Sequence, residues 1–384
     1  MTLFLLMILS ICSISNVSLL QSSTAEPTWS CTIQNCVPPQ TQPQNDSTQW
    51  IDVTALEIEG MGWDKEIRPF RRLPDKYKDT VTESVWYLSS HSAGIAVHFT
   101  VTGTTFIDAK WQLNENLYLA HMTPQGVNGL DLYVKIDGRW KWAGIGKPSQ
   151  TGNHQHCMLR EGFLPHKTYE CMVYLPLYTG VASMQLGFSP LAEVKPYKSN
   201  KKPLVCYGTS ILHGCSASRT GMTFVAMLGR HFDLPTVNLG FSGNGKMENY
   251  FADILGEIDA SLYLIDCLPN MGALSEDEIY QRVCHLVRRL RALHPQTPIV
   301  LVEDRTMEDP VFTDIPPVNP RRRAQKRAYD ILKKSIAHLY YIKGDEIFGS
   351  QEDATVDGSH PSDLGMLLYY HALKRTISKA LRAK

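Results

Sequence analysis

The chain has 384 residues, enough for two domains, and its 43% hydrophobic and 20% charged residues are typical of an ordinary globular protein. This composition excludes a disordered or collagen-like chain. The 38 basic and 38 acidic residues leave a formal net charge of zero, so the chain lacks the basic excess expected of a nucleic-acid-binding protein.

Residues 1–25 carry no charged side chain, and an apolar run at 3–9 is followed by small and polar residues that end in Ser-Thr-Ala. This pattern predicts a signal peptide cleaved before Glu26 and an exported protein, periplasmic or extracellular. Serines interrupt the stretch, and a membrane span needs about 20 strongly apolar residues, so no integral span is expected after processing. Lipid attachment at Cys12 stays open as an alternative, because Leu-Ser-Ile-Cys at 9–12 is similar to a lipobox.

Residues 26–49 are rich in Pro, Gln, Ser and Thr and are predicted to form a mobile lead-in. From 50 to 191, short runs of alternating apolar and polar residues follow one another, as at 94–101 and 130–136, and helical periodicity is absent. The Asp-Gly pair at 137–138 lies between two such runs, as in a β-hairpin turn. We therefore predict an antiparallel β-sandwich domain over 50–191.

Residues 192–203 are polar, include two prolines and are predicted to be a linker. From 204 to 384, strand patterns alternate with helical ones, which predicts a three-layer α/β domain built on a parallel sheet. Strands are expected near 205–208, 236–239, 262–265, 298–303 and 339–343, and helices over 222–231, 275–293, from 319 onward and over 362–381. A Ser-Glu-Asp-Glu capping box at 275–278 predicts the start of the second of these helices.

A serine, Ser210, follows the first strand of this domain directly after a Gly-Thr turn. In an open α/β sheet, ligands bind outside the carboxyl ends of the strands, so Ser210 is a candidate nucleophile. A serine hydroxyl needs a base within hydrogen-bond reach, and that base needs a third group to orient it. The segment Asp-Gly-Ser-His-Pro at 357–361 offers His360 as the base and Asp357 as the group that orients it.

Negative charge that develops on an attacked carbonyl needs fixed hydrogen-bond donors. Two turns at the ends of later strands can supply them. The first, at 238–245, contains Gly243, whose backbone N–H can approach a ligand closely. The second, at 266–271, carries the side-chain amide of Asn270.

Serine, glycine, asparagine and histidine in this chain order, with Asp-x-x-His near the carboxyl end, resemble the SGNH branch of the GDSL esterase/lipase superfamily over about 203–384. The resemblance implies Ser210 as nucleophile, Gly243 and Asn270 as oxyanion-hole donors, His360 as base and Asp357 as its orienting group. The sequence departs from the family pattern twice. Gly-Thr-Ser replaces Gly-Asp-Ser at 208–210, and Leu-Pro-Asn-Met at 268–271 replaces Gly-x-Asn-Asp.

Gly-Leu-Asp-Leu-Tyr at 129–133 resembles the Gly-x-Asp-Leu-Tyr motif of a β-domain that precedes some of these hydrolases. More loosely, this resemblance extends over residues 50–190. It implies a two-domain protein in which a β-sandwich precedes the catalytic domain.

Two further side chains are candidates for lining the substrate pocket. Arg305 follows a predicted strand, with an internal ion pair as the alternative, and His213 closely follows Ser210, with packing as the alternative. The segment His-Gln-His-Cys at 154–157 resembles a metal cluster, but no fourth ligand lies nearby, so no metal is predicted. No dinucleotide or Walker loop occurs, and no cofactor is expected.

Export would place eight cysteines in an oxidising compartment, where Cys31 with Cys36 and Cys157 with Cys171 are candidate disulfides. Cys206 and Cys267 lie on predicted buried strands and are expected to be packed thiols. The pattern Cys-x-x-Cys does not occur in the chain, so the cysteine spacing gives no support for a zinc or thioredoxin-like site.

Together these features predict a serine esterase that hydrolyses short acyl esters, with acetyl esters of carbohydrates or small molecules as the expected substrates. Two alternatives stay open. An acyltransferase would form the same acyl-enzyme and pass the acyl group to an alcohol. A non-catalytic glycan-binding protein would use the β-domain, because all seven tryptophans precede residue 143 and aromatic faces stack on sugar rings. The oligomeric state is not indicated by the sequence.

Overall fold

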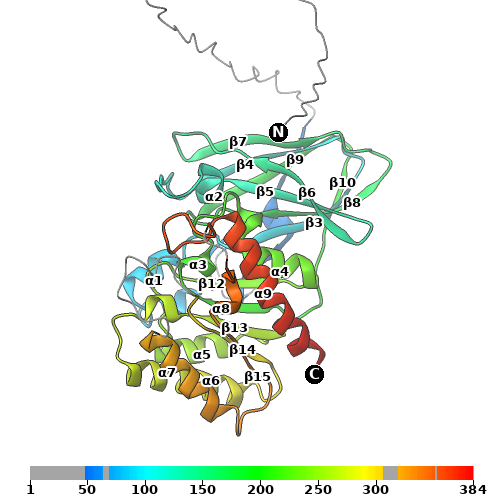
Figure 1. The fold of residues 1–384 in the computed structure, drawn as a ribbon. Coiled ribbons are helices and arrows are strands. Elements are labelled where there is room, and N and C mark those ends of the chain that lie inside the picture. Colours follow the sequence, from blue (N-terminus) through cyan, green and yellow to red (C-terminus); the bar gives the residue numbers. More distant parts are fainter. Residues whose placement is uncertain (1–47, 64–68, 306–318, 351–352, 384) are drawn as a thin grey trace, which may run out of the picture. The chain divides into compact units, whose positions relative to one another are not determined.

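The computed structural model describes residues 48–63, 69–305, 319–350 and 353–383, and residues 45–384 belong to one compact unit (Figure 1). The predicted signal peptide, almost all of the lead-in, Cys12 and the Cys31–Cys36 pair lie outside the described residues. Within the described ranges, no helix combines the length and apolar character needed to cross a membrane.

Two antiparallel sheets make up most of the amino-terminal half of the described chain. The first has the strand order β1 (Gln49–Asp52), β9 (Val181–Phe188), β4 (Phe106–Leu113) and β7 (His154–Glu161). The second has the order β10 (Glu193–Pro196), β3 (Ala96–Thr102), β8 (Thr168–Tyr174), β5 (Leu130–Ile136) and β6 (Arg139–Gly146), with β2 (Glu57–Glu59) also paired to β3. The predicted hairpin at 137–138 is confirmed as the turn between β5 and β6.

The inner faces of these two sheets share one hydrophobic core. Ile107 and Trp111 of the first sheet pack with Val97, Phe99 and Leu132 of the second, and all five side chains are almost fully buried. The alternating pattern of the sequence places every second side chain on this inner face. The predicted antiparallel sandwich is therefore confirmed.

The carboxyl-terminal half contains a five-stranded parallel sheet with the order β12 (Thr236–Gly240), β11 (Leu204–Gly208), β13 (Leu262–Asp266), β14 (Ile299–Val302) and β15 (Leu339–Ile342). The α-helices among the described residues of this half are α3 (Ser210–His213), α4 (Phe224–Phe232), α5 (Asn249–Gly256), α6 (Glu276–Leu293), α7 (Pro320–Leu332), α8 (Asp345–Phe348) and α9 (Asp363–Arg382). The helices form layers on the two sides of the sheet (Figure 1).

The two faces of the parallel sheet bury alternate residues of the same strand. On β11, Val205 and Tyr207 pack in the core that includes α5, α6 and α7, whereas Leu204 and Cys206 pack in the core that includes α4 and α9. Burial on both faces explains why the strand reads as a continuous apolar run. The predicted three-layer α/β fold is confirmed.

Local capping sets the limits of several helices. The capping box predicted at 275–278 is present, and α6 follows it as far as Leu293, as predicted. The helix predicted over 222–231 instead begins at Phe224, because the Thr223 side chain accepts a hydrogen bond from the backbone N–H of Ala226 and caps the helix there.

The amino-terminal half departs from the sequence prediction in three places. Part of the predicted linker forms β10, which pairs with β3 at the edge of the second sheet. Two short helices, α1 (Glu83–Leu88) and α2 (Pro124–Asn128), occur where no helical period was visible, since each is too short to show one. The segment around α1 packs in the core of the parallel sheet, with Leu73 and Val85 fully buried there.

The Gly-x-Asp-Leu-Tyr motif joins the β-sandwich to the segment that follows α3. Asp131 is fully buried and accepts hydrogen bonds from the backbone N–H of Gly221, at 2.9 Å, and from Nη1 of Arg219, at 2.5 Å. The Tyr133 hydroxyl also accepts a hydrogen bond from Arg219, at 2.8 Å, and Trp142 donates to Asp131 at 2.9 Å. The motif therefore holds residues 219–221 against the β-sandwich.

Candidate active site

The order of the parallel strands brings three loops to one place. β11 lies between β12 and β13, and Gly208 at its end is in register with Gly240 on one side and Asp266 on the other. After β11, helix α4 packs on one face of the sheet, whereas α6, which follows β13, packs on the other. Such a switch point is where α/β sheets bind ligands. The segments that carry Ser210, Gly243 and Asn270 therefore leave the sheet side by side.

Ser210 is the first residue of α3, directly after the turn that ends β11. The Thr209 side chain accepts a hydrogen bond from the backbone N–H of Ile211, and Gly214 ends the helix at a φ of +111°. Ser210 itself is 7% exposed. A Cβ at Gly245 would lie 2.1 Å from the Gly208 carbonyl, so the glycine allows the loop after β12 to lie against the end of β11.

Ser210, His360 and Asp357 form a continuous hydrogen-bonded chain. The Ser210 Oγ lies 2.9 Å from Nε2 of His360, and Nδ1 of the same ring lies 2.7 Å from Oδ2 of Asp357. The other oxygen of Asp357 accepts the backbone N–H groups of Ser359, at 2.9 Å, and His360, at 2.7 Å. This is the mutual geometry that a nucleophile, a base and an orienting group require.

The charges of Asp357 and His360 follow from these contacts. Partial burial acts to raise the pKa of Asp357, but the hydrogen bonds from His360 and from the two backbone N–H groups outweigh it and lower the pKa to about 2. The pKa of His360 is raised to about 9 by a hydrogen bond with Cys215 and by the bond to Asp357, which together outweigh the lowering effect of burial. Asp357 is therefore ionised at neutral pH and stabilises the imidazolium form of His360.

The two candidate oxyanion donors lie next to each other. Asn270 ends a 3-10 turn, Leu268–Asn270, and its Nδ2 donates a hydrogen bond to the carbonyl of Asn244, the residue after Gly243. Because an amide nitrogen carries two hydrogens, one N–H of Asn270 remains for a ligand. Gly243 has a φ of +66°, and a Cβ there would meet no described atom within 4 Å, so its backbone borders open space.

Arg305 does not line the pocket as predicted, because its side chain is buried with only 1% exposed. Its Nη2 donates to the carbonyl of Ser359 and lies 3.2 Å from the Ser359 hydroxyl, and its Nη1 lies 3.7 Å from Asp304. Arg305 thus supports the turn between Asp357 and His360 through its contacts with Ser359. The prediction of a substrate contact is corrected to a structural contact with this turn.

His213 is also not a pocket residue, since it is completely buried. Its ring stacks on Tyr178 with centroids 4.3 Å apart, and its Nε2 donates to the carbonyl of Leu177 at 2.8 Å. Burial, with a smaller effect of the nearby Arg72, lowers the pKa of His213 well below its ordinary value. His213 is therefore a neutral packing residue, and the predicted substrate contact is wrong.

Two residues near the base were not identified from the sequence. Cys215 is buried beside His360, and the His121 ring lies 5.6 Å from the His360 ring, centroid to centroid. His121 belongs to the segment between β4 and α2, and its carbonyl accepts a hydrogen bond from Ser216 at 3.1 Å. Nothing in the local pattern around His121 indicates this proximity, whereas Cys215 is five residues from Ser210 and follows the glycine that ends α3.

The structure separates the other cysteine and histidine candidates. Cys157 and Cys171 are both free among the described cysteines; Cys157 lies partly exposed on β7 of one sheet, and Cys171 lies fully buried on β8 of the other. The predicted disulfide between them is therefore wrong. In the His-Gln-His-Cys segment at 154–157, His156 is bound through Nε2 to Oδ2 of Asp108 at 2.8 Å.

The tryptophans of the β-domain divide into buried and exposed ones. Trp111 lies in the sandwich core, and its Nε1 donates to the carbonyl of Asn128 at 3.1 Å. Trp142 is 51% exposed. Cys206 and Cys267 are buried free thiols, as predicted.

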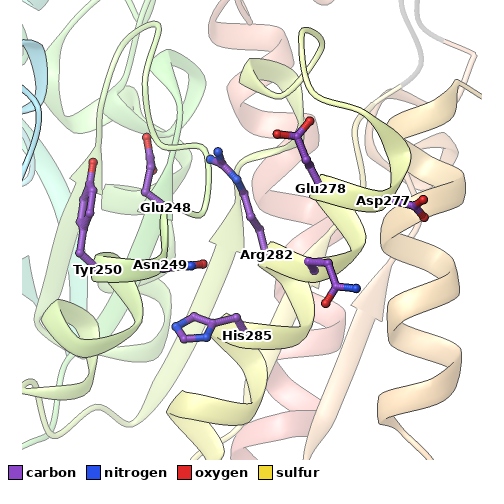
Figure 2. Close-up of a pocket in the computed structure, with 8 residues that line it drawn as sticks. Glu248, Asn249, Tyr250, Asp277, Glu278, Arg282 and His285 are labelled. Atoms are coloured by element: carbon purple, nitrogen blue, oxygen red, sulfur yellow. The ribbon is translucent and has the colours of Figure 1, made fainter.

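A cavity of about 560 Å³ lies between α5 and α6, apart from Ser210, His360 and Asp357 (Figure 2). Figure 2 shows Arg282 between Glu248 and Glu278, with His285 one turn further along α6. The other residues that line the cavity are Asn249, Tyr250, Asp277 and Gln281. Ser210, Asp357 and His360 are absent from the described residues that line the cavity, so the cavity is distinct from the hydrogen-bonded chain that these three residues form.

Comparison with protein-family models matches residues 201–378 to the GDSL-like lipase/acylhydrolase family. Residues 48–194 match a model described as the N-terminus of SGNH-hydrolase-type esterases. A search of curated proteins found no significant match.

Three solved structures resemble nearly the whole chain. A Bacteroides ovatus ATCC 8483 protein assigned as a GDSL-like lipase is 36% identical, with a TM-score of 0.80 over 87% of this chain and 98% of that one. A salicylyl-acyltransferase from a tetracycline biosynthetic pathway is 18% identical, with a TM-score of 0.72 over 88% and 98%. A family two carbohydrate esterase from Cellvibrio japonicus is 12% identical, with a TM-score of 0.55 over 88% and 98%. The last two likenesses show the fold alone.

Proposed function

The chain belongs to the GDSL-like lipase/acylhydrolase family, and we propose that it is a serine esterase that hydrolyses short acyl esters through an acyl-enzyme on Ser210. One observation carries the proposal. The Ser210 hydroxyl lies 2.9 Å from a histidine nitrogen whose ring is held by a carboxylate at 2.7 Å. A packed serine at a turn has no need of such a partner, whereas a nucleophilic serine does.

The proposed reaction has two halves. Ser210 attacks the ester carbonyl while Nε2 of His360 takes the hydroxyl proton, and the same nitrogen then returns the proton to the departing alcohol. Asp357 keeps the ring oriented and stabilises its positive charge. Water then attacks the acyl carbonyl while Nε2 of His360 takes its proton, and the imidazolium returns that proton to the Ser210 oxygen as the bond to the acyl group breaks. The carboxylic acid leaves, and Ser210 and neutral His360 are regenerated.

Negative charge on the carbonyl oxygen is stabilised by two donors in this proposal, the backbone N–H of Gly243 and the free N–H of Asn270. The contact of Asn270 with the neighbouring carbonyl of Asn244 supports the pairing of these donors. Fixed donors of this kind supply about 2.7–4 kcal/mol each to the stabilisation of the transition state.

For the substrate we propose acetyl or similarly short acyl esters of carbohydrates. Support comes from the carbohydrate esterase among proteins of the same fold. The half-exposed indole of Trp142 in the β-domain offers an aromatic face of the kind that stacks on sugars. We also propose that the protein is exported after cleavage at residues 25–26, which mass spectrometry of the protein recovered outside the cytoplasm would test.

An acyltransferase is the second candidate, favoured by the salicylyl-acyltransferase of the same fold with a TM-score of 0.72. Both reactions use the same acyl-enzyme, and they differ in whether water or an alcohol accepts the acyl group. Product analysis with and without a large excess of acceptor sugar separates them. Free acid as the main product in both conditions supports the esterase, and transfer product in excess over acid supports the transferase.

The test of the proposed function is a screen of acetylated oligosaccharides and p-nitrophenyl esters of increasing chain length. Ser210→Ala should show no turnover above the uncatalysed rate, and Ser242→Ala, a hydroxyl in the neighbouring loop, should retain activity. A fluorophosphonate should add one mass equivalent to the intact protein and none to Ser210→Ala. Ester turnover that survives in Ser210→Ala would refute the assignment, and a lack of turnover by the wild type on every ester would favour the non-catalytic alternative.

A further inference from the structure

We propose that His121, Cys215 and His360 form a binding site for Zn²⁺, and that zinc bound there stops ester hydrolysis by taking His360 away from Ser210. The inhibitory effect rests on the function proposed above. The metal site itself does not rest on that function, because it depends only on the positions of these three side chains.

The three side chains converge from separate parts of the chain. One nitrogen of each histidine and the sulfur of Cys215 all lie within 4.8 Å of one another. In a tetrahedral zinc site with bonds of about 2.0–2.3 Å, neighbouring ligand atoms are roughly 3.5 Å apart. Closing the site therefore needs shifts of roughly 1 Å. The exposed His121 can make such a shift, since it lies on the connection between β4 and α2.

The contacts of His360 prepare it as a metal ligand as well as a base. Its Nδ1 is bound to Asp357 at 2.7 Å, and zinc-binding histidines as a rule donate their second ring N–H to a carboxylate, a backbone carbonyl or water. Nε2 is then the nitrogen left for a metal. The same atom lies 2.9 Å from the Ser210 hydroxyl, so a metal on Nε2 and proton transfer from Ser210 exclude each other.

The donor set suits zinc. One thiolate and two imidazoles are borderline-soft ligands of the kind that bind zinc, and a water molecule completes the tetrahedron. On binding, the Cys215 thiol releases its proton to solvent, and any proton on Nε2 of His360 is released as well. Solvent reaches the site from the side of His121, since Cys215 is only 1% exposed and the His360 side chain is 23% exposed.

Cobalt reports on the site without any assay of catalysis. Protein freed of metal by dialysis against EDTA should bind one Co²⁺ per chain and develop a thiolate-to-cobalt charge-transfer band in the near ultraviolet, which one equivalent of Zn²⁺ removes. Cys215→Ser should lose the band. His121→Ala should bind Co²⁺ at least tenfold more weakly. Cys157→Ser, a free thiol beside another histidine, should keep the wild-type band.

Inhibition supplies the second measurement. The Zn²⁺ concentration that halves the ester hydrolysis rate, taken relative to each protein's own metal-free rate, should rise at least tenfold in His121→Ala and stay unchanged in His156→Ala. Because Cys215 is buried, thermal unfolding of Cys215→Ser is measured in parallel, and the exposed His121→Ala provides an independent variant.

The proposal is overturned if wild-type protein gives no charge-transfer band, if the band survives in Cys215→Ser, or if His121→Ala binds Co²⁺ as tightly as the wild type. A cobalt site that behaves as expected in a protein without ester turnover would support the metal site and refute only the proposed function. Equal zinc sensitivity of His121→Ala and wild type would overturn the inhibitory mechanism.

Discussion

Replacing Asp266 by Asn should stabilise the protein at neutral pH, and the gain should grow as the pH rises. Asp266 ends β13 and is buried, and neither of its carboxylate oxygens has a hydrogen-bond partner among the described residues. Burial and the nearby Asp304, opposed by Arg305, raise its pKa from 3.8 to about 7. Tyr369, Cys206 and Cys267 are further ionisable groups close to it.

The sign follows from proton binding. Between pH 4 and 7 the folded state holds a proton on Asp266 that the unfolded state has lost, so stability falls as the pH rises. Relative to the protonated form, the carboxyl costs about 2 kcal/mol at pH 5 and about 4 kcal/mol at pH 8, using about 1.36 kcal/mol for each unit of pKa. The advantage of Asp266→Asn should therefore increase by about 2–3 kcal/mol between these two pH values.

Urea unfolding followed by tryptophan fluorescence at pH 5 and pH 8 measures this difference. Any cost of the new amide that does not depend on pH cancels, because each variant is compared with the wild type at both pH values. Asp259→Asn, at an exposed carboxylate, serves as the control and should show no such change. An equal stability difference for Asp266→Asn at pH 5 and pH 8 would refute the reasoning.

Four further predictions concern the candidate site and its support. Asn270→Ala should lower kcat by about 10²–10³-fold, the usual loss for one oxyanion donor, and steady-state kinetics with full activity would remove Asn270 from the proposed mechanism. Arg305→Met should lower kcat more than it changes KM, because the turn that carries His360 loses its support; an unchanged kcat would show that the turn holds without it. Asp131→Ala should lower the free energy of unfolding by about 3 kcal/mol, since Arg219, Trp142 and the Gly221 N–H all lose their acceptor; urea unfolding measures the change, and an effect below about 1 kcal/mol would contradict it. The hydrolysis rate should rise with pH, because His360 must be neutral to accept a proton and its pKa lies above the ordinary 6.5; rates measured from pH 5 to 10 against the Ser210→Ala blank would contradict this if they levelled off below pH 6.5.

Much of the architecture could be predicted from local patterns. Alternating residues indicated the sandwich strands, apolar runs indicated the buried parallel strands, and the capping box marked the start of α6. The hydrogen-bonded candidates Ser210, Asp357 and His360 could be named because each falls in a turn whose residue types are specific. These signals extend over a few residues of the chain, and a sequence displays them directly.

The predictions that failed depended on distance through space. Arg305 and His213 are polar residues near strand ends, and only the packing around them decides that both are buried. The disulfide predicted between Cys157 and Cys171 failed for a related reason, because the pattern of a strand does not give the distance or direction between side chains on different strands. Helices as short as α1 and α2 have too few residues to show a period.

The sequence alone determined most of the longer strands and helices, and which turns carry the candidate nucleophile, base and orienting carboxylate, because these depend on side-chain periodicity and turn chemistry within each segment. Only the tertiary structure decided which side chains meet. The order β12, β11, β13 brings three loops together, and the contact of Asp131 with the segment after α3 joins the sandwich to them. His121 comes to lie beside His360 because strand order and register, rather than separation along the chain, set the distances between side chains.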